Sequence, residues 1–366
     1  RKICARTKLL TGRLMFITQQ NYPREQVCVI HGDIYNCNST DIVDIDDIKN
    51  LSGDYCLAIC KEDKLILATD PFRTKLLFLN IDPDNRTFAV SHDPREIKKL
   101  GLTPYLLEEN TIFVLDLHTF AINKQENHTW DLTQKDSTHT RVFEAFEHAI
   151  SNRFNNKTKL LMSSGYDSGA TACALHKQGN VNFSISWLDL DDNGEDRRVL
   201  GERLQLHKGK LFKHKKRDIS NIQNMFLYPN MNDGLAESYA ATLEYMKTIE
   251  MDSIIVAHGG AFYNDYGFQG EQFGVQSIFG GLFPKQLELI YPRKLVSLIE
   301  LTGGIDLFGT YYQCTVKQAI LDINLVQAWI HTKPELKNKR DRNWMYEYMK
   351  DHNYPMQDAF LYTDMI

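Results

Sequence analysis

The sequence predicts an α/β protein: an α+β N-terminal domain of antiparallel sheets, then a doubly wound parallel sheet with a helical C-terminal part. Up to about residue 125, short apolar runs alternate with polar turns and helical periodicity is scarce. From about residue 137, short apolar runs alternate with amphipathic stretches, as in a parallel sheet whose strands are joined by helices. The run 159–174 predicts a strand, a tight turn and a helix in succession.

Length, charge and cysteine content narrow the class of protein. At 366 residues we expect two domains, 1–125 and 137–366, with the polar stretch 123–136 as the boundary. The net charge of −5 provides no electrostatic footprint for nucleic acid, and no apolar run approaches the roughly 20 residues of a membrane helix. No apolar core follows the basic first residues, so no secretory signal is predicted, and seven cysteines without a metal-like cluster favour the cytoplasm.

Short strands dominate the prediction for the first domain. Six apolar runs predict strands, at 27–30, 55–59, 65–68, 76–79, 88–90 and 111–115. Lys-Glu-Asp at 61–63 and Asp-Asn-Arg at 84–86 predict hairpin turns. We therefore expect one antiparallel sheet or a pair of them.

The second domain begins with a helix, because Val142, Phe146 and Ile150 recur at helical spacing. Further strands are predicted at 181–188, 210–212 and 253–257, and helices at 195–207 and 237–249. The tail from Pro284 is predicted to be helical, with apolar stripes that include Leu295, Leu298, Ile299, Val316, Ala319, Ile320, Ile323, Val326, Met345, Tyr348 and Met349. Two charged stretches, 189–195 and 213–217, are interpreted as solvated loops, with a metal site and a contact to an acidic substrate as the respective alternatives.

The turn after residue 162 has the residue types of a phosphate site. Ser163, Ser164 and Ser168 supply hydroxyls, and Gly165 allows close approach of the backbone to a ligand. The N-terminus of the following helix favours an anion, above all a phosphate. Asp167 suits this place if a divalent cation lies between its carboxylate and the phosphate oxygens. An ordinary strand-to-helix turn is the alternative interpretation.

This loop resembles the pyrophosphate-binding loop of the asparagine synthetase family, whose pattern is Ser-Gly-Gly-X-Asp-Ser. Ser164 departs from the pattern, because it replaces the first glycine. The resemblance implies binding of ATP and Mg²⁺ in an ATP-pyrophosphatase domain. The implied nucleotide-binding residues here are Ser163, Ser164, Gly165, Tyr166, Asp167 and Ser168, with Ser186 on the strand that holds the adenine edge in the family.

Four segments of the first domain, in order, resemble the family's glutamine amidotransferase domain. His-Gly-Asp-Ile-Tyr-Asn at 31–36 is similar to Asn-Gly-Glu-Ile-Tyr-Asn, and 51–59 is similar to the strand Leu-X-Gly-X-Phe-Ala-Phe. Asp-Pro-Phe-Arg-Thr-Lys-Leu-Leu-Phe at 70–78 resembles Asp-Pro-X-Gly-X-Lys-Pro-Leu-Tyr, and 88–91 resembles Phe-X-X-Ala-Ser. The resemblance implies Ntn-hydrolase-like antiparallel sheets.

The resemblance also marks what the first domain lacks. The family's glutaminase uses a first-residue cysteine whose own α-amino group is the base. Here Arg1 stands first, Cys4 has no free amine beside it, and His31 replaces the asparagine that stabilises the oxyanion. Such an oxyanion donor contributes about 3–4 kcal/mol. We therefore expect a structural remnant without glutaminase activity, with processing that exposes Cys4 as the alternative.

The segment 258–268, after the strand at 253–257, resembles the family's loop Ser-Gly-X-Gly-X-Asp-Glu-X-X-X-Gly-Tyr. Gly259 and Gly260 are implied nucleotide-binding residues. The family's Asp-Glu pair becomes Phe-Tyr here, and Asp265, three places later, is the candidate for the second Mg²⁺ ligand. Loss of one carboxylate weakens divalent binding and the neutralisation of pyrophosphate.

The resemblance implies an ATP-dependent amide-bond-forming ligase without its own glutaminase. It would adenylate a substrate carboxylate, release AMP and pyrophosphate, and use Asp167 and Asp265 as the catalytic and Mg²⁺-binding residues. The expected partners are a small-molecule or peptide carboxylate and an amine donor or ammonia, with a homodimer as one option for the assembly. The alternative is a catalytically inactive pseudoenzyme that serves as a binding or structural module.

The first prediction concerns the missing glutaminase. Incubated with glutamine, the protein should release no glutamate above the uncatalysed background, because both the nucleophile's base and the oxyanion donor are replaced. A coupled glutamate assay measures this. Glutamate release at enzyme rates would show that the first domain is not a remnant.

Overall fold

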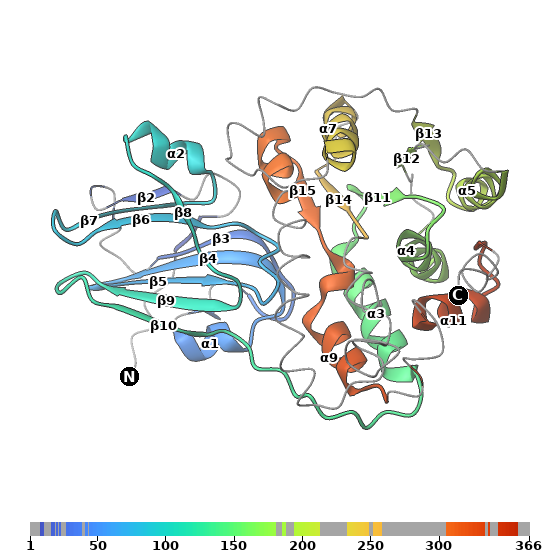
Figure 1. Cartoon of the computed structure of the whole chain (residues 1–366), viewed down its shortest axis with the longest axis horizontal. Coiled ribbons are helices and arrows are strands. Elements are labelled where there is room, and N and C mark those ends of the chain that lie inside the picture. The colour runs from blue at the N-terminus through green and yellow to red at the C-terminus, as the bar shows by residue number, and fades with distance from the viewer. Residues whose placement is uncertain are drawn as a thin grey trace, which may run out of the picture. The chain divides into compact units, whose positions relative to one another are not determined.

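The computed structural model describes residues 8–10, 16–18, 20, 22, 27–38, 41–42, 44–180, 185–187, 194–212, 233–248, 252–257, 305–333, 336 and 343–357. Close packing divides the chain into two compact units. Unit 1 holds the described residues up to Trp130 together with 305–311, and unit 2 holds the rest of the described chain. Figure 1 shows the elements of each unit by label.

Unit 1 contains two sheets, in which the six predicted strands and both predicted hairpin turns are present. The larger sheet has the order β1 (Lys8–Leu10), β3 (Val27–Ile34), β4 (Gly53–Lys61), β5 (Lys64–Thr69), β9 (Thr111–Asp116) and β10 (Ile122–Glu126). The smaller sheet has the order β2 (Phe16–Thr18), β7 (Thr87–Ser91), β6 (Phe78–Asp82) and β8 (Tyr105–Leu106). All neighbouring strands are antiparallel except β1 and β3, which are parallel. The predicted antiparallel pair of sheets is therefore confirmed.

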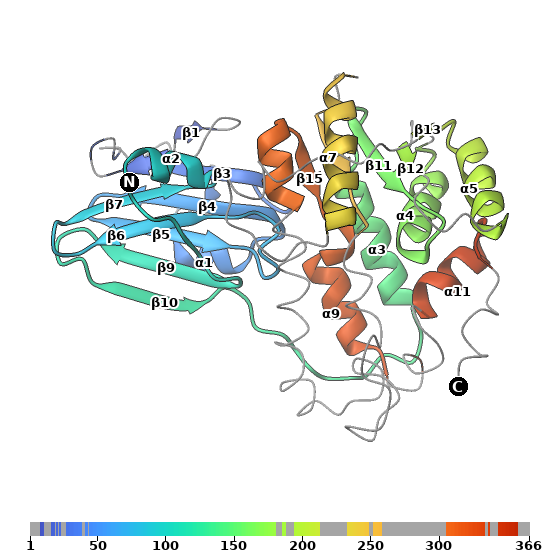
Figure 2. The same cartoon turned by 45° about the horizontal axis from the view of Figure 1, so that its top comes forward.

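Side chains on both faces of the larger sheet are buried, which explains its continuous apolar runs. Along β4, Cys56, Ala58 and Cys60 lie in a core cluster that also contains residues of the smaller sheet. Leu57 and Ile59 point to the other face and pack with the residues around α1 (Ile45–Lys49). The helix α2 (Pro94–Lys99) packs on β6 and β7. Unit 1 is thus a stack of four layers, with a helix outside each sheet (Figure 2).

Unit 2 is built on the predicted parallel sheet. Its order is β13 (Lys210–Phe212), β12 (Ile185–Trp187), β11 (Thr158–Met162), β14 (Ser253–Ile255) and β15 (Thr315–Lys317). Every pairing in it is parallel. The first three strands in sequence therefore run outward from β11 in one direction, and the last two run outward in the other. The strand order reverses between β11 and β14.

Helices cover this sheet on both sides. The helices described in unit 2 are α3 (Thr140–Arg153), α4 (Tyr166–Lys177), α5 (Gly194–Leu206), α7 (Asp233–Thr248), α9 (Ile323–His331) and α11 (Asn343–Asp351). The helix α4 packs on β11, and α3 and α11 pack against α4. Figure 1 shows α7 on the other face of the sheet from α4. The doubly wound arrangement thus agrees with the sequence prediction.

The prediction of a wholly helical tail is wrong at one place. Val316 lies in the edge strand β15, where it is paired with Ile254 of β14, and Ala319 begins a short 3₁₀ helix, Ala319–Leu321. The sheet offered an unpaired edge at β14, and pairing with it outweighs the helical spacing of these apolar residues. The predicted stripe at 295–299 lies outside the described residues.

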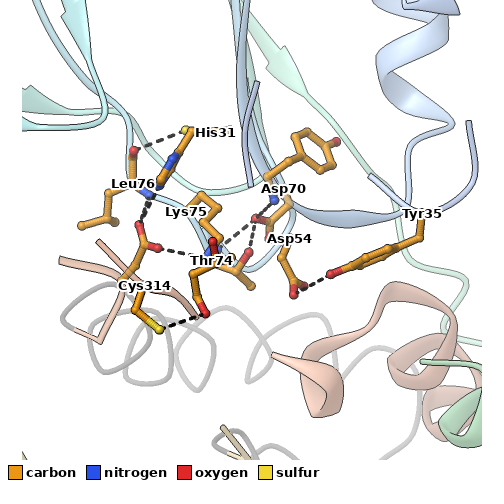
Figure 3. A network of polar contacts seen from close by, with 12 residues as sticks. His31, Tyr35, Asp54, Asp70, Thr74, Lys75, Leu76 and Cys314 are labelled. Carbon is orange, nitrogen blue, oxygen red and sulfur yellow. Dashed lines mark hydrogen bonds and ion pairs between the residues drawn. The ribbon is translucent and has the colours of Figure 1, made fainter. Parts of the chain in front are cut away.

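A buried ion pair fixes residues 305–311 within unit 1. Lys75 Nζ lies 2.9 Å from Asp306 Oδ1, and the Leu76 amide donates to Asp306 Oδ2 at 3.2 Å (Figure 3). Lys75 is 1% exposed and Asp306 3%. Burial alone would raise the pKa of Asp306, but the Lys75 ammonium and then His31 reverse this, so the net pKa lies well below its usual value. The carboxylate is therefore charged at neutral pH and accepts hydrogen bonds from the Lys75 ammonium and the Leu76 amide.

The second prediction tests this ion pair. Asp306→Ala removes the hydrogen-bonded counter-ion of the buried Lys75 ammonium and should lower the free energy of unfolding by about 3–5 kcal/mol. The double variant Lys75→Met/Asp306→Leu should lose less, because both members of the ion pair are removed together. Urea unfolding followed by fluorescence measures both. Lys124→Met, which removes an exposed pair with Glu108, should cost at most about 1 kcal/mol. An Asp306→Ala cost no larger than this control would contradict the assignment.

Candidate nucleotide-binding loop and its surroundings

The candidate site lies at the carboxyl end of β11 in unit 2. In open α/β sheets, ligands bind in the crevice outside the strand ends where the strand order reverses, and here that point is between β11 and β14. The chain leaves β11 after Met162, and Gly165 is the N-cap of α4. No side chain caps this helix. The positive end of the α4 dipole therefore faces the ligand-binding edge of the sheet without a side-chain cap.

Two of the predicted serines hold the loop in shape. The Ser163 amide donates to Ser168 Oγ at 3.0 Å, and the two hydroxyl oxygens lie 2.9 Å apart. The Gly165 amide donates to Ser163 Oγ at 3.3 Å. The structure thus brings the predicted hydroxyls of Ser163 and Ser168 together, and it uses them to close the turn. The Ser164 hydroxyl takes no part in these bonds.

Arg203 of α5 supports the same loop from the interior of unit 2. Its Nη1 donates to the Ser163 carbonyl at 2.6 Å and to the Gly165 carbonyl at 2.9 Å. The side chain is fully buried, which lowers its pKa to about 10 and leaves it charged at neutral pH. Its other partners are the Pro355 carbonyl and the Met349 sulfur. Within the described residues, every hydrogen-bond partner of this cation is neutral.

The residues that follow α11 are anchored beside this arginine. Tyr354 is 4% exposed, and its hydroxyl lies 2.8 Å from Nε2 of the buried His207. The guanidinium of Arg203 lies over the Tyr354 ring, and its Nε donates to the Pro355 carbonyl at 2.8 Å. A buried aromatic ring and a charge-assisted hydrogen bond together fix the course of this segment.

The end of this segment lies over the loop itself. The Gln357 side-chain amide donates to Ser164 Oγ at 3.4 Å and also to the Asp196 carboxylate of α5. The Tyr166 hydroxyl donates to the Gln357 carbonyl at 3.4 Å. We call residues 354–357 the C-terminal strap. Gln357 of the strap thus links the loop to Asp196, although neither Gln357 nor Asp196 was predicted as a site residue.

The remaining predicted residues are placed only in part. Asp167 lies in the first turn of α4, next to the loop. Ser186 lies in β12 opposite Met162, so its backbone is beside the end of β11. Gly259, Gly260 and Asp265 lie outside the described residues. No three metal-binding side chains gather at one point in the part of the chain that the structure describes.

Sequence analysis missed Arg203, although one signal for it exists. Val199, Leu200, Arg203 and His207 follow helical spacing on α5 and its end, and all four are buried. A charged residue on the apolar face of a helix needs a specific partner. No comparable signal marks Gln357, because its contacts with the loop depend only on the path of the chain after Tyr354.

In unit 1, His31, the residue predicted to replace an oxyanion donor, forms a stacked pair with His92. The rings of His31 and His92 stack with centroids 4.1 Å apart, and His31 Nε2 lies 3.7 Å from Asp306 Oδ2. Burial, and then His31, lower the pKa of His92 to about 3, so His92 is neutral. All four described cysteines of unit 1, Cys28, Cys37, Cys56 and Cys60, have raised pKa values, chiefly because of burial. None of these four is an activated thiolate. Cys4 lies outside the described residues.

Comparisons with known proteins assign no family to the chain. No protein-family model and no curated protein matches the sequence. One similar solved structure is the allosteric regulatory enzyme of purine biosynthesis, at 11% identity and TM-score 0.25, covering 53% of this chain and 61% of that one. Another is glutamine phosphoribosylpyrophosphate amidotransferase from B. subtilis, at 10% identity and TM-score 0.25, covering 66% and 63%. This chain spans less than two thirds of either protein, and scores this low support no inference about function.

The described helices were also compared with the length and hydropathy that a bilayer requires. Among them, none combines sufficient length with sufficient apolar character to span a membrane.

The third prediction concerns the anchor of the strap. Burial, and then His176 and Arg203, lower the pKa of His207 to about 4, against about 6.5 in an unfolded chain. Between these values the unfolded state binds more protons, so stability is full above pH 6.5 and falls as the pH drops towards 4. His207→Gln should reduce this loss, by on the order of 2 kcal/mol between pH 7 and 4.5.

Urea unfolding at the two pH values measures the difference. His118→Gln is the control, because the His118 side chain is 79% exposed. If His207→Gln and His118→Gln show the same pH dependence as the parent protein, the buried neutral state of His207 is excluded.

Proposed function

We propose that unit 2 binds Mg²⁺-ATP at the loop 163–168, and that the protein is an ATP-dependent amide-bond-forming ligase. One observation carries this proposal. A Ser-Ser-Gly-Tyr-Asp-Ser loop and an N-terminus without a side-chain cap lie at the point where a five-stranded parallel sheet reverses its order. Loop chemistry and position in the sheet are independent features, and both favour a phosphate-containing ligand.

The residues present fit a nucleotide triphosphate. Ser163 and Ser168 hold the turn, so a phosphate would be bound mainly by the backbone N–H groups of the loop and by Ser164. Mg²⁺ in phosphate sites is held by one or two carboxylates together with the phosphates, so a cage of three protein ligands is not required. Asp167 supplies one carboxylate. Asp265, which lies outside the described residues, is the proposed second one.

Bound ATP would supply an activated phosphate, and the protein would position a substrate carboxylate against it. Attack of the carboxylate oxygen on the α-phosphorus forms an acyl-adenylate and releases pyrophosphate. An amine nitrogen then attacks the acyl carbon, and AMP leaves. The proposed amine is ammonia or a substrate amine, because the described cysteines of unit 1 are not activated and His31 replaces the oxyanion donor.

The second candidate function is a pseudoenzyme that binds a ligand without turnover. The observation in its favour is the strap, in which Gln357 donates hydrogen bonds to Ser164 of the loop and to Asp196 of α5. The replacement of the family's acidic pair by Phe262 and Tyr263 points the same way.

The fourth prediction tests the proposed function. Calorimetric titration with a non-hydrolysable ATP analogue should show binding that is stronger with Mg²⁺ than without it. Asp167→Asn should remove the Mg²⁺-dependent part, because the amide lacks the charge that holds the cation, whereas binding without Mg²⁺ should persist. Asp351→Asn, on α11, is the matched control and should change nothing.

Pyrophosphate release then separates the two candidates. Release that depends on an added carboxylate and amine supports the ligase. Magnesium-dependent nucleotide binding without pyrophosphate release, when a broad set of carboxylates is tested, supports the pseudoenzyme. No binding at millimolar nucleotide would exclude both forms of the proposal.

A further inference from the structure

A buried positive charge lies directly beneath the loop 163–168. We propose that Arg203 is a positioning residue for the anion bound at this loop, and that Gly169 is required because it admits the Arg203 guanidinium. Neither residue belongs to the pattern Ser-Gly-Gly-X-Asp-Ser. The inference rests on the proposed function and adds to it the residues that orient the N–H groups of the loop towards the bound anion.

The carbonyl groups of two peptides in the loop point towards Arg203. Arg203 Nη1 donates to the carbonyls of Ser163 and Gly165, at 2.6 and 2.9 Å. In a trans peptide the C=O and the following N–H point in opposite directions. Because both carbonyls turn to Arg203, the N–H groups of Ser164 and Tyr166 turn away from it. Together with the Gly169 amide and the Ser168 hydroxyl, which donate to the same two carbonyls, Arg203 thereby holds these oxygens, which repel an anion, away from the ligand-binding edge.

A second feature is the charge of Arg203. The guanidinium is fully buried, and its described partners are three carbonyl oxygens and one sulfur atom. The described hydrogen-bond partners of this buried cation are neutral, and the Asp196 carboxylate acts on it only through space, so a further nearby anion offsets part of the cost of its burial. The Arg203 charge adds to the positive end of the α4 dipole at the same loop. Both fields favour a phosphate or pyrophosphate there.

A third feature is the space that the guanidinium occupies. A Cβ atom at Gly169 would lie 2.7 Å from Arg203 Cζ and 2.9 Å from Nη1, closer than real side chains approach. Gly169 lies inside α4, where glycine is less favourable than alanine by about 1 kcal/mol. The packing of Arg203 explains why this position lacks a side chain. Gly169 and Arg203 therefore act as a pair.

The fifth prediction uses this pair. Arg203→Met keeps a long side chain but removes the charge and the carbonyl contacts, and Gly169→Ala displaces the guanidinium. Each should weaken binding of inorganic pyrophosphate and of Mg²⁺-ATP by about tenfold or more, which is the effect of losing a charge-assisted hydrogen bond. Arg203→Lys keeps the charge and should bind with intermediate affinity. In the Arg203→Met background, Gly169→Ala should add little, because no guanidinium remains to be displaced.

Matched controls lie on the same helix as Arg203. A Cβ at Gly201 would meet open space, so Gly201→Ala should leave both affinities unchanged. Arg198→Met removes an exposed arginine that pairs with Glu202 and should also leave them unchanged. Thermal unfolding is measured on every variant, because a purely structural role for Arg203 predicts lower stability with unaltered affinity.

The outcomes distinguish this inference from the proposed function. If the parent protein binds Mg²⁺-ATP and Arg203→Met binds it equally well, the inference is wrong and the proposed function stands. If the parent protein binds pyrophosphate but not ATP, and the variants weaken that binding, the inference stands and the nucleotide function is wrong. If the parent protein binds neither probe, both are wrong.

Discussion

The ion pair between Lys75 and Asp306 is the constraint that holds residues 305–311 in unit 1. The two residues are 231 positions apart, and both are almost fully buried. A buried pair of this kind adds little net stability compared with apolar packing, but an incorrect partner leaves a charge stranded. Its main effect is therefore selective, because this placement of residues 305–311 supplies the carboxylate to which the Lys75 ammonium is hydrogen-bonded.

Unit 2 uses buried cations in the same way. Arg153 of α3 lies 2.8 Å from Asp322, whose carboxylate also caps α9. Arg203 joins the loop after β11 to the strap, in which its partner Pro355 lies 152 positions after Arg203 in the chain. In each case a helix residue collects acceptors from a distant segment, and apolar side chains fill the space around it. Local strands and helices thus determine the layers, whereas buried charges determine which distant segments meet.

The sequence was informative where the signal is local. Apolar runs predicted six strands of unit 1, and the four that lie in its larger sheet have continuous apolar runs because both faces of that sheet are buried. The pattern of serine, glycine and aspartate predicted the loop, since close backbone approach needs small residues. Arg203 and Gln357 could not be located in this way, because they reach Gly165 and Ser164 from 38 and 193 positions away. The strand β15 was mistaken for helix, since three residues contain too little periodicity to decide.

The absence of a side chain at Gly169 has a consequence for comparing this chain with its relatives. A larger residue at that position would have to displace a guanidinium at the equivalent of Arg203, because its Cβ would lie within 3 Å of the guanidinium atoms. The two positions should therefore change together during divergence, although one lies on α4 and the other on α5. This linked pair offers a criterion for recognising distant homologues whose overall sequence identity is too low to align the rest of the chain.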